Sequence, residues 1–152
     1  MIETGHLCFL FWYDKMIVVR GMDTRNINVI TLAYLGDSIY EVYIRNYLIH
    51  KGIAKVDDLQ REAVNYVSAK SQCRLLNNLI DSNYLTQEEI DIVKRGRNYN
   101  RVSHPKNTDI LTYKMSTGFE ALIGYLYLEN KKGRMEEIIN NIICGGNNEK
   151  NN

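Results

Sequence analysis

The 152-residue sequence contains a single proline and no cysteines spaced as zinc ligands or as a disulfide framework. Its three cysteines, Cys8, Cys73 and Cys144, lie far apart, which is typical of a protein from the reducing cytoplasm. Because helix-breaking proline is so rare, long helices can form. No apolar run reaches the roughly 20 residues that a transmembrane helix needs, so we expect no membrane-spanning segment.

The sequence also has almost no net charge, since 19 Lys and Arg residues stand against 18 Asp and Glu residues. A net charge of +1 argues against nucleic-acid binding by bulk charge, so any basic surface must be local. No glycine-rich loop suited to phosphate is present. Ser38, Ser116 and Thr117 lack the histidine and aspartate pattern of a nucleophilic triad. The composition, 45% hydrophobic and 24% charged, is that of an ordinary globular domain.

The first 21 residues differ from the regular pattern of the remaining chain. They contain apolar runs at 8–13 and 16–19, and no Lys or Arg precedes the first run as in a signal peptide. We expect residues 1–21 to be an upstream extension; an extra strand and a membrane-surface anchor are the alternatives. The working domain is expected at 22–144, followed by a polar, disordered tail at 145–152.

Apolar residues recur at helical spacing through most of the chain, and no strand or internal repeat is evident. The spacing predicts an all-α fold of about six or seven helices. The expected helices are 26–51, 56–81 (with a break into two near 68–71), 86–95, 108–130 and 134–143. Thr86 and Glu89 form a capping-box pattern, and Gly133 is expected to separate the last two helices.

The helix expected at 26–51 carries carboxylates where a structural helix has little use for them. Its predicted core stripe is Leu32, Leu35, Ile39 and Val42, beside a stripe of Tyr34, Asp37, Glu41, Ile44 and Leu48. Asp37 and Glu41 are therefore one turn apart on one face. Gly36 costs about 1 kcal/mol relative to alanine inside a helix, and the close approach of another backbone would explain it.

The helix expected at 108–130 shows the same arrangement. Its core stripe is Met115, Phe119, Leu122 and Leu126. On the adjacent stripe, Glu120 lies one turn before Gly124. Two helices that each carry a glycine can cross closely, and such a crossing would bring Asp37 and Glu120 into one cluster.

A cluster of carboxylates is self-repelling unless a cation holds it. Ligation by oxygen alone suits Mg²⁺ or Mn²⁺ rather than zinc, and a water on such an ion could attack a phosphate. The alternative hypothesis is structural: Asp37 and Glu41 are partly buried acids that pair with Arg45 or with a nearby lysine.

Positive charge gathers around the irregular segment expected at 96–107. From 94 to 114, six cations stand against Asp109 alone: Lys94, Arg95, Arg97, Arg101, Lys106 and Lys114. This excess, with His104 as a further contact or a general base, favours a phosphate-binding loop. A solvated loop without a ligand is the alternative, although a loop of this length in a compact domain is usually functional or disordered.

Two motifs in this sequence resemble those of the ribonuclease III catalytic domain. Residues 35–41, Leu-Gly-Asp-Ser-Ile-Tyr-Glu, are similar to its signature helix, and residues 117–124, Thr-Gly-Phe-Glu-Ala-Leu-Ile-Gly, to its second acidic motif. Residues 56–79 and the Arg-Gly-Arg-Asn segment at 95–98 resemble the bacterial Mini-III branch, which has no double-stranded-RNA-binding domain. The resemblance covers residues 26–143.

The resemblance implies a Mg²⁺-dependent endonuclease, active as a homodimer, that cuts double-stranded RNA and leaves 5′-phosphate ends. It implies that the enzyme trims the precursor of large-subunit (23S) ribosomal RNA in the cytoplasm, where a ribosomal protein could contribute to its specificity. Asp37 matches the catalytic aspartate and Glu120 the metal-binding glutamate of the family. Glu41 could be an outer-shell ligand that reaches the metal through water.

The sequence departs from ordinary ribonuclease III at two acidic positions, and the Mini-III branch shares both departures. Ala33 replaces a glutamate four residues before Asp37, and Thr117 replaces an aspartate three residues before Glu120. Fewer carboxylates should hold fewer metal ions. The rival hypothesis is a non-catalytic helical module that binds RNA or assists ribosome assembly through the basic loop alone.

Overall fold

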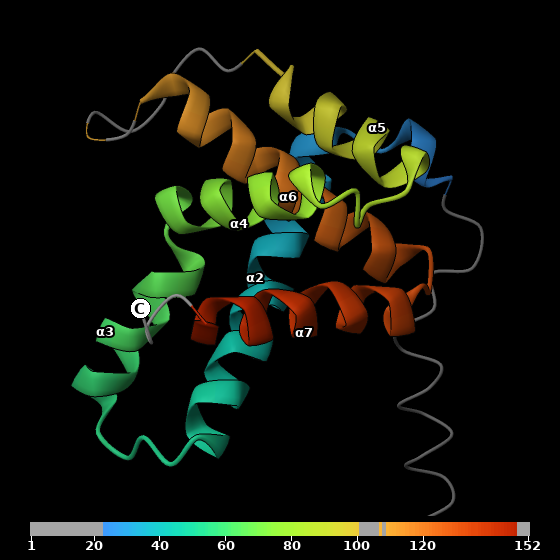
Figure 1. The fold of residues 1–152 in the computed structure, drawn as a ribbon. Coiled ribbons are helices and arrows are strands. Elements are labelled where there is room, and N and C mark those ends of the chain that lie inside the picture. Colours follow the sequence, from blue (N-terminus) through green and yellow to red (C-terminus); the bar gives the residue numbers. More distant parts are fainter. Residues whose placement is uncertain (1–22, 101–106, 108, 149–152) are drawn as a thin grey trace, which may run out of the picture.

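The computed structural model describes residues 23–100, 107 and 109–148 (Figure 1). These residues form seven helical segments and no strand, which confirms the all-α prediction. The segments are the 3-10 helix η1 (Thr24–Asn26) and the α-helices α2 (Val29–His50), α3 (Val56–Val67), α4 (Ala69–Asp81), α5 (Gln87–Arg97), α6 (Ile110–Leu128) and α7 (Lys132–Asn148). None of the described helices combines the length and apolarity that crossing a bilayer requires.

Helix α6 lies at the centre of the fold, and α2, α4, α5 and α7 all pack against it (Figure 1). Its predicted core stripe is confirmed, because Met115, Phe119, Leu122 and Leu126 are all buried. Burial extends well beyond that stripe to most of the helix surface. Such a helix is apolar nearly all round, so a polar side chain on it stands out.

Helix α2 buries Leu32 of its predicted core stripe, but its buried face otherwise differs from the predicted one. The buried residues are Val29, Leu32, Ala33, Gly36, Tyr40, Ile44 and Leu48. Val42, predicted in the core, is 64% exposed, and Leu35 and Ile39 are only half-buried. The prediction failed because it followed the apolar side chains, whereas the face that carries Gly36 is the one that meets α6.

The contact between α2 and α6 depends on a pair of glycines. A Cβ atom on Gly36 would overlap the carbonyl oxygen of Glu120 and lie 2.7 Å from the backbone nitrogen of Gly124. A Cβ atom on Gly124 would in turn overlap the carbonyl oxygen of Leu32. Real Cβ atoms essentially never come that close to backbone, so the predicted close crossing of these helices is confirmed.

A second glycine pair holds α5 against α6. A Cβ atom on Gly96 would lie 2.8 Å from the Cα atom of Gly118, and one on Gly118 would lie 2.7 Å from the carbonyl oxygen of Val93. This crossing was not predicted, because Gly96 and Arg97 were expected to lie in a loop, whereas both belong to α5. The basic last turn of α5 suits a helix, since cations favour the C-terminal end of the dipole.

Two other helix boundaries follow their predicted signals. Ser68 ends α3 and caps α4 by accepting a hydrogen bond from the backbone nitrogen of Ser71, which confirms the predicted break. Thr86 and Glu89 form the predicted capping box at the start of α5.

The start and the end of α7 differ from the prediction, which gave 134–143 for this helix. Gly133 lies in the first turn of α7, and the chain instead leaves α6 through Asn130, whose φ of 57° is in the left-handed region that asparagine tolerates. Helix α7 continues to Asn148, so residues 145–148 are helical where a disordered tail was expected.

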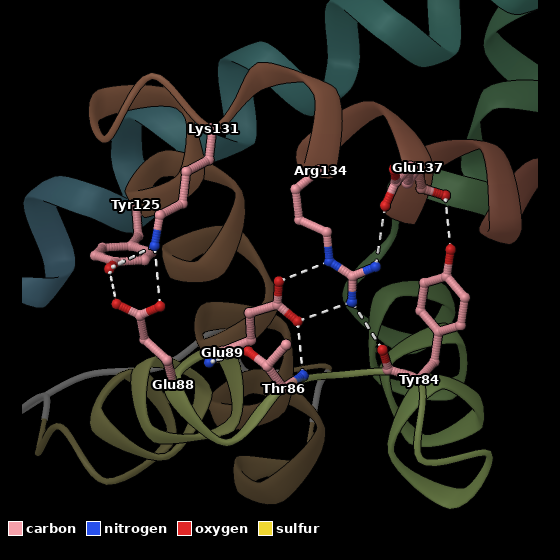
Figure 2. Close-up of polar contacts among 8 residues, drawn as sticks. All are labelled: Tyr84, Thr86, Glu88, Glu89, Tyr125, Lys131, Arg134 and Glu137. Carbon is pink, nitrogen blue, oxygen red and sulfur yellow. Dashed lines mark hydrogen bonds and ion pairs between the residues drawn. The ribbon is translucent and has the colours of Figure 1, made fainter.

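A polar network ties the start of α5 to the start of α7 (Figure 2). The buried carboxylate of Glu89 accepts hydrogen bonds from Nε and Nη2 of Arg134 at 2.8 and 3.0 Å, and from the backbone N–H of Thr86 at 2.8 Å. Burial raises the pKa of Glu89, but these hydrogen bonds and the charge of Arg134 outweigh it and hold the pKa below its usual value. The neighbouring Glu88 forms a separate contact, in which its carboxylate accepts a hydrogen bond from the Tyr125 hydroxyl at 2.6 Å.

Candidate active site

Asp37 and Glu120 lie at the crossing of α2 and α6. Asp37 directly follows Gly36, and the Glu120 backbone is what Gly36 contacts. Both carboxylates line one surface pocket of about 170 Å³, which we call the acidic pocket. Its lining residues are Ile30, Ala33, Tyr34, Asp37, Tyr113, Thr117 and Glu120. The glycine crossing therefore brings the two predicted acids together, as the sequence led us to expect.

The Asp37 carboxylate is held in an unfavourable electrostatic environment. Burial raises the pKa of Asp37, and the negative charge of Glu41 one turn away raises it further. No side chain among the described residues forms an ion pair with it. Removing a carboxylate from water without a compensating partner is costly, so a bound cation would stabilise this side chain.

Glu41 behaves as the structural hypothesis predicted. Its carboxylate accepts a hydrogen bond and ion pair from the guanidinium of Arg45, and Glu41 is not among the residues that line the acidic pocket. The structural hypothesis thus fits Glu41, whereas Asp37 has no such partner in the described part of the chain. An outer-shell role for Glu41 stays a prediction.

The acidic pocket offers two carboxylates to a metal ion. Ala33 and Thr117, the positions at which carboxylates are missing, both line it, and the Thr117 hydroxyl donates to the carbonyl oxygen of Tyr113 at 3.0 Å. No group of three or more histidine, cysteine or acidic ligands occurs within the described ranges. Two carboxylates with water in the remaining positions is a donor set that suits Mg²⁺, which keeps several of its waters.

The described cations at the end of α5 are engaged in different ways. Lys94 lies 3.9 Å from the carboxylate of Asp91 and is exposed. Arg95 is half-buried and donates to the carbonyl oxygen of Ile27, which ties α5 to the segment before α2. Within the described residues, Arg97 donates a hydrogen bond from Nε to the side-chain oxygen of its neighbour Asn98 at 3.2 Å. The predicted contacts Arg101, His104 and Lys106 lie outside the described residues, as does the extension at 1–21.

A smaller hollow adjoins the acidic pocket, and the sequence analysis did not single it out. Its lining residues are Ile30, Gly96, Tyr99, Ile110, Tyr113, Lys114 and Thr117. Ile30, Tyr113 and Thr117 belong to both depressions. From the sequence, Lys114 was treated only as one of six local charges. Its spacing of four residues from Ile110 and three from Thr117 places all three on one face of a helix, and that was the signal that could have located it here.

The glycine-crossed helices and the acidic pocket define an all-helical domain of the ribonuclease III type, and comparisons with known proteins agree. The family model described as the ribonuclease III domain matches residues 30–131. The chain is 47% identical over 130 residues to Mini-ribonuclease 3 of Enterococcus faecalis, covering 84% of this chain and 98% of that one. It is 47% identical over 118 residues to Mini-ribonuclease 3 of Streptococcus pneumoniae, covering 78% and 92%.

A solved structure shows the same fold. The crystal structure of protein FN1578 from Fusobacterium nucleatum superposes with a TM-score of 0.72 at 34% identity, covering 82% of this chain and 98% of that one. The chain belongs to the ribonuclease III domain family that its two motifs predicted. Its Mini-ribonuclease 3 relatives confirm the branch that residues 56–79 and 95–98 predicted. It is an endoribonuclease that acts on double-stranded RNA, which sets aside the rival non-catalytic hypothesis. Enzymes of this family depend on divalent metal ions and typically act as dimers.

Proposed function

We propose that Asp37 and Glu120 form the metal-binding catalytic centre and that its ion is Mg²⁺, with Mn²⁺ as a substitute. Two observations support this assignment: both carboxylates line one pocket, and Asp37 is half-buried with no cationic partner among the described side chains. When bound there, the ion supplies charge neutralisation at the phosphate and an activated water for hydrolysis.

The protein itself contributes geometry to this reaction. The Gly36 and Gly124 contact fixes the two carboxylates relative to each other, because neither backbone can move without breaking the crossing. With a divalent ion bound, Asp37 and Glu120 would hold that ion against the reacting phosphate. Water adds to phosphorus while the bond from phosphorus to the 3′-oxygen breaks. The products are a 5′-phosphate and a 3′-hydroxyl, with the water proton passing to solvent or to the departing oxygen.

Substitution of the carboxylates tests this centre. In a long RNA duplex with Mg²⁺, we expect Asp37→Asn and Glu120→Gln to lose about 1,000-fold in rate, equivalent to about 4 kcal/mol of transition-state stabilisation. Glu41→Gln is the matched control, since it removes a charge from the same helix but outside the pocket. It should lose at most about tenfold. If Asp37→Asn cut as fast as Glu41→Gln, the assignment would be wrong.

We further propose that the basic end of α5 and the segment after it grip the RNA backbone. The contacts are Lys94 and Arg97 of the described residues, with Arg101, His104 and Lys106 beyond them. Arg95 was predicted among these contacts. Its hydrogen bond to the Ile27 carbonyl oxygen suggests that it positions the others instead. Shape and phosphate contacts dominate recognition of an A-form duplex, whose major groove is too narrow for side chains.

A homodimer is also proposed, and the outer face of α2 supports it. Tyr34, Val42 and Ile49 are 80%, 64% and 58% exposed and recur at seven and eight residues along one side of the helix. Tyr34 also lines the acidic pocket. A two-fold axis across this face would cover the apolar residues and place two acidic pockets side by side, one for each RNA strand.

The natural substrate we propose is the precursor of large-subunit (23S) ribosomal RNA, processed by the 22–144 domain in the cytoplasm, with a ribosomal protein as a further specificity factor. The name of the relatives, Mini-ribonuclease 3, is consistent with ribosomal RNA processing and supports this proposal. Cells that produce only Asp37→Asn should accumulate 23S RNA with extended ends. If the 23S RNA ends were unchanged, the proposed natural substrate would be wrong, but the endonuclease activity would not be affected by that result.

A further inference from the structure

The acidic pocket and the adjoining hollow lie side by side along α6, and we call the two together the groove. They share Ile30, Tyr113 and Thr117 as lining residues. One end of this groove holds Asp37 and Glu120. The crossing of α5 over α6 builds the other end, because it brings the end of α5 and the turn after it against the first turns of α6. A single strand of substrate laid along the groove would therefore pass both ends.

Lys114 gives the far end of the groove a positive charge. It is the only cation among the described residues that line the adjoining hollow. It is half-buried, and no described carboxylate pairs with it, in contrast to Lys94, which lies 3.9 Å from Asp91. Six residues separate Lys114 from Glu120 on the same helix, which corresponds to about 9 Å along the axis.

We propose that the ammonium group of Lys114 binds a phosphate next to the one that is cut, and so sets the position of the RNA strand in the groove. This inference rests on the proposed cutting site at Asp37 and Glu120. An unpaired ammonium group is a point charge suited to a phosphate oxygen. Tyr99, 38% exposed, forms the α5 side of the same hollow and limits where that phosphate can lie. The contact carries no base information, so it acts equally on every sequence.

Binding measurements test this contact apart from catalysis. We compare Lys114→Met with Lys132→Met, which removes the same charge from α7, where Lys132 is exposed and lines neither depression. With a short RNA duplex and chelator instead of metal, Lys114→Met should bind about tenfold more weakly, as expected for one charged hydrogen bond. Its slope of log affinity against log salt should fall by about 1, equally for two duplexes of unrelated sequence. Lys114→Arg should restore both values, and unchanged thermal unfolding shows that the fold is intact.

Neutral linkages in the RNA identify the phosphate. An uncharged methylphosphonate is placed, in turn, on either side of the scissile phosphate. One of the two substitutions should weaken RNA binding by the wild-type enzyme about tenfold. The same substitution should leave binding by Lys114→Met unchanged, because the neutral linkage and the loss of the lysine remove the same interaction. Additive losses at both positions, or Lys114→Met behaving like Lys132→Met, would overturn the proposal. If the wild type cuts the same duplex and Asp37→Asn does not, the proposed cutting site holds even when the Lys114 proposal is wrong.

Discussion

Gly36→Ala adds one methyl group at the crossing that carries the proposed active site. That methyl group would lie 2.7 Å from the Gly124 nitrogen and overlap the Glu120 carbonyl oxygen. Ordinary contact needs at least 3.4 Å, so α2 and α6 must separate by at least about 0.7 Å, and further to clear the carbonyl. Both obstacles are backbone atoms, so no side-chain rotation relieves the overlap.

The cost to stability can be placed between two opposing effects. Overpacking a rigid contact costs about 3 kcal/mol, the upper part of the usual range. Alanine in place of glycine within a helix returns about 1 kcal/mol. We therefore expect the free energy of unfolding to fall by about 2 kcal/mol, which lowers the melting temperature by about 4 to 8 °C in a chain of this size.

The effect on activity should exceed the effect on stability. Asp37 and Glu120 lie on the two helices that are forced apart, and a misplacement of about 1 Å can cost about 100-fold in rate. Cleavage of a long RNA duplex at a temperature where the variant is fully folded measures this loss, and urea unfolding measures the stability.

Gly133→Ala is the matched control for this experiment. A Cβ atom on Gly133 meets nothing within 4 Å, and the residue lies in the first turn of α7. It should be neutral or slightly stabilising and fully active, by the same helix preference. If Gly36→Ala were as stable and as active as Gly133→Ala, the crossing would not be what positions the carboxylates.

Two further predictions concern the fold and the assembly. The pKa of Glu89 is lowered in the folded protein, so its contribution to stability is present above its unfolded value of 4.5 and disappears as the pH falls through the lower folded value. Glu89→Gln should therefore unfold about 2 kcal/mol more easily at pH 7, with the gap to wild type closing below pH 4.5 in urea titrations; a gap independent of pH would contradict this. Val42→Glu should convert the dimer to a monomer by light scattering and slow duplex cleavage, whereas Asn140→Glu on the exposed face of α7 should change neither; a dimeric Val42→Glu would place the interface elsewhere.

The sequence was most informative where a helix is buried on nearly every side. In α6 the apolar stripe through Phe119 and Leu122 leaves no ambiguity about the core, so Glu120 beside it stood out. Helix α2 has apolar residues on two faces, and the pattern alone favoured the one with Val42. If the proposed dimer covers that face, the pattern had found the contact with a second subunit, which a rule based on apolar spacing cannot tell from a core.

The second glycine crossing escaped prediction for a different reason. Glycine and clustered cations are common loop signals, so Gly96 and Arg97 were taken to lie beyond the helix. Whether a glycine breaks a helix or lets another helix approach depends on the partner surface, here Gly118, which is distant in sequence. Local sequence cannot supply that information, and the adjoining hollow with Lys114 was missed along with it.

The two crossings together explain how the proposed catalytic centre could consist of so few side chains. Glu120 lies on α6 between Gly118, which meets α5, and Gly124, which meets α2. Backbone contacts on both sides thus fix its helix, and the same α2 contact fixes Asp37. Most sites hold their carboxylates through surrounding hydrogen bonds, which add further polar residues. Here the backbone supplies that rigidity, so Ala33 and Thr117 can occupy positions where a larger site would place acids.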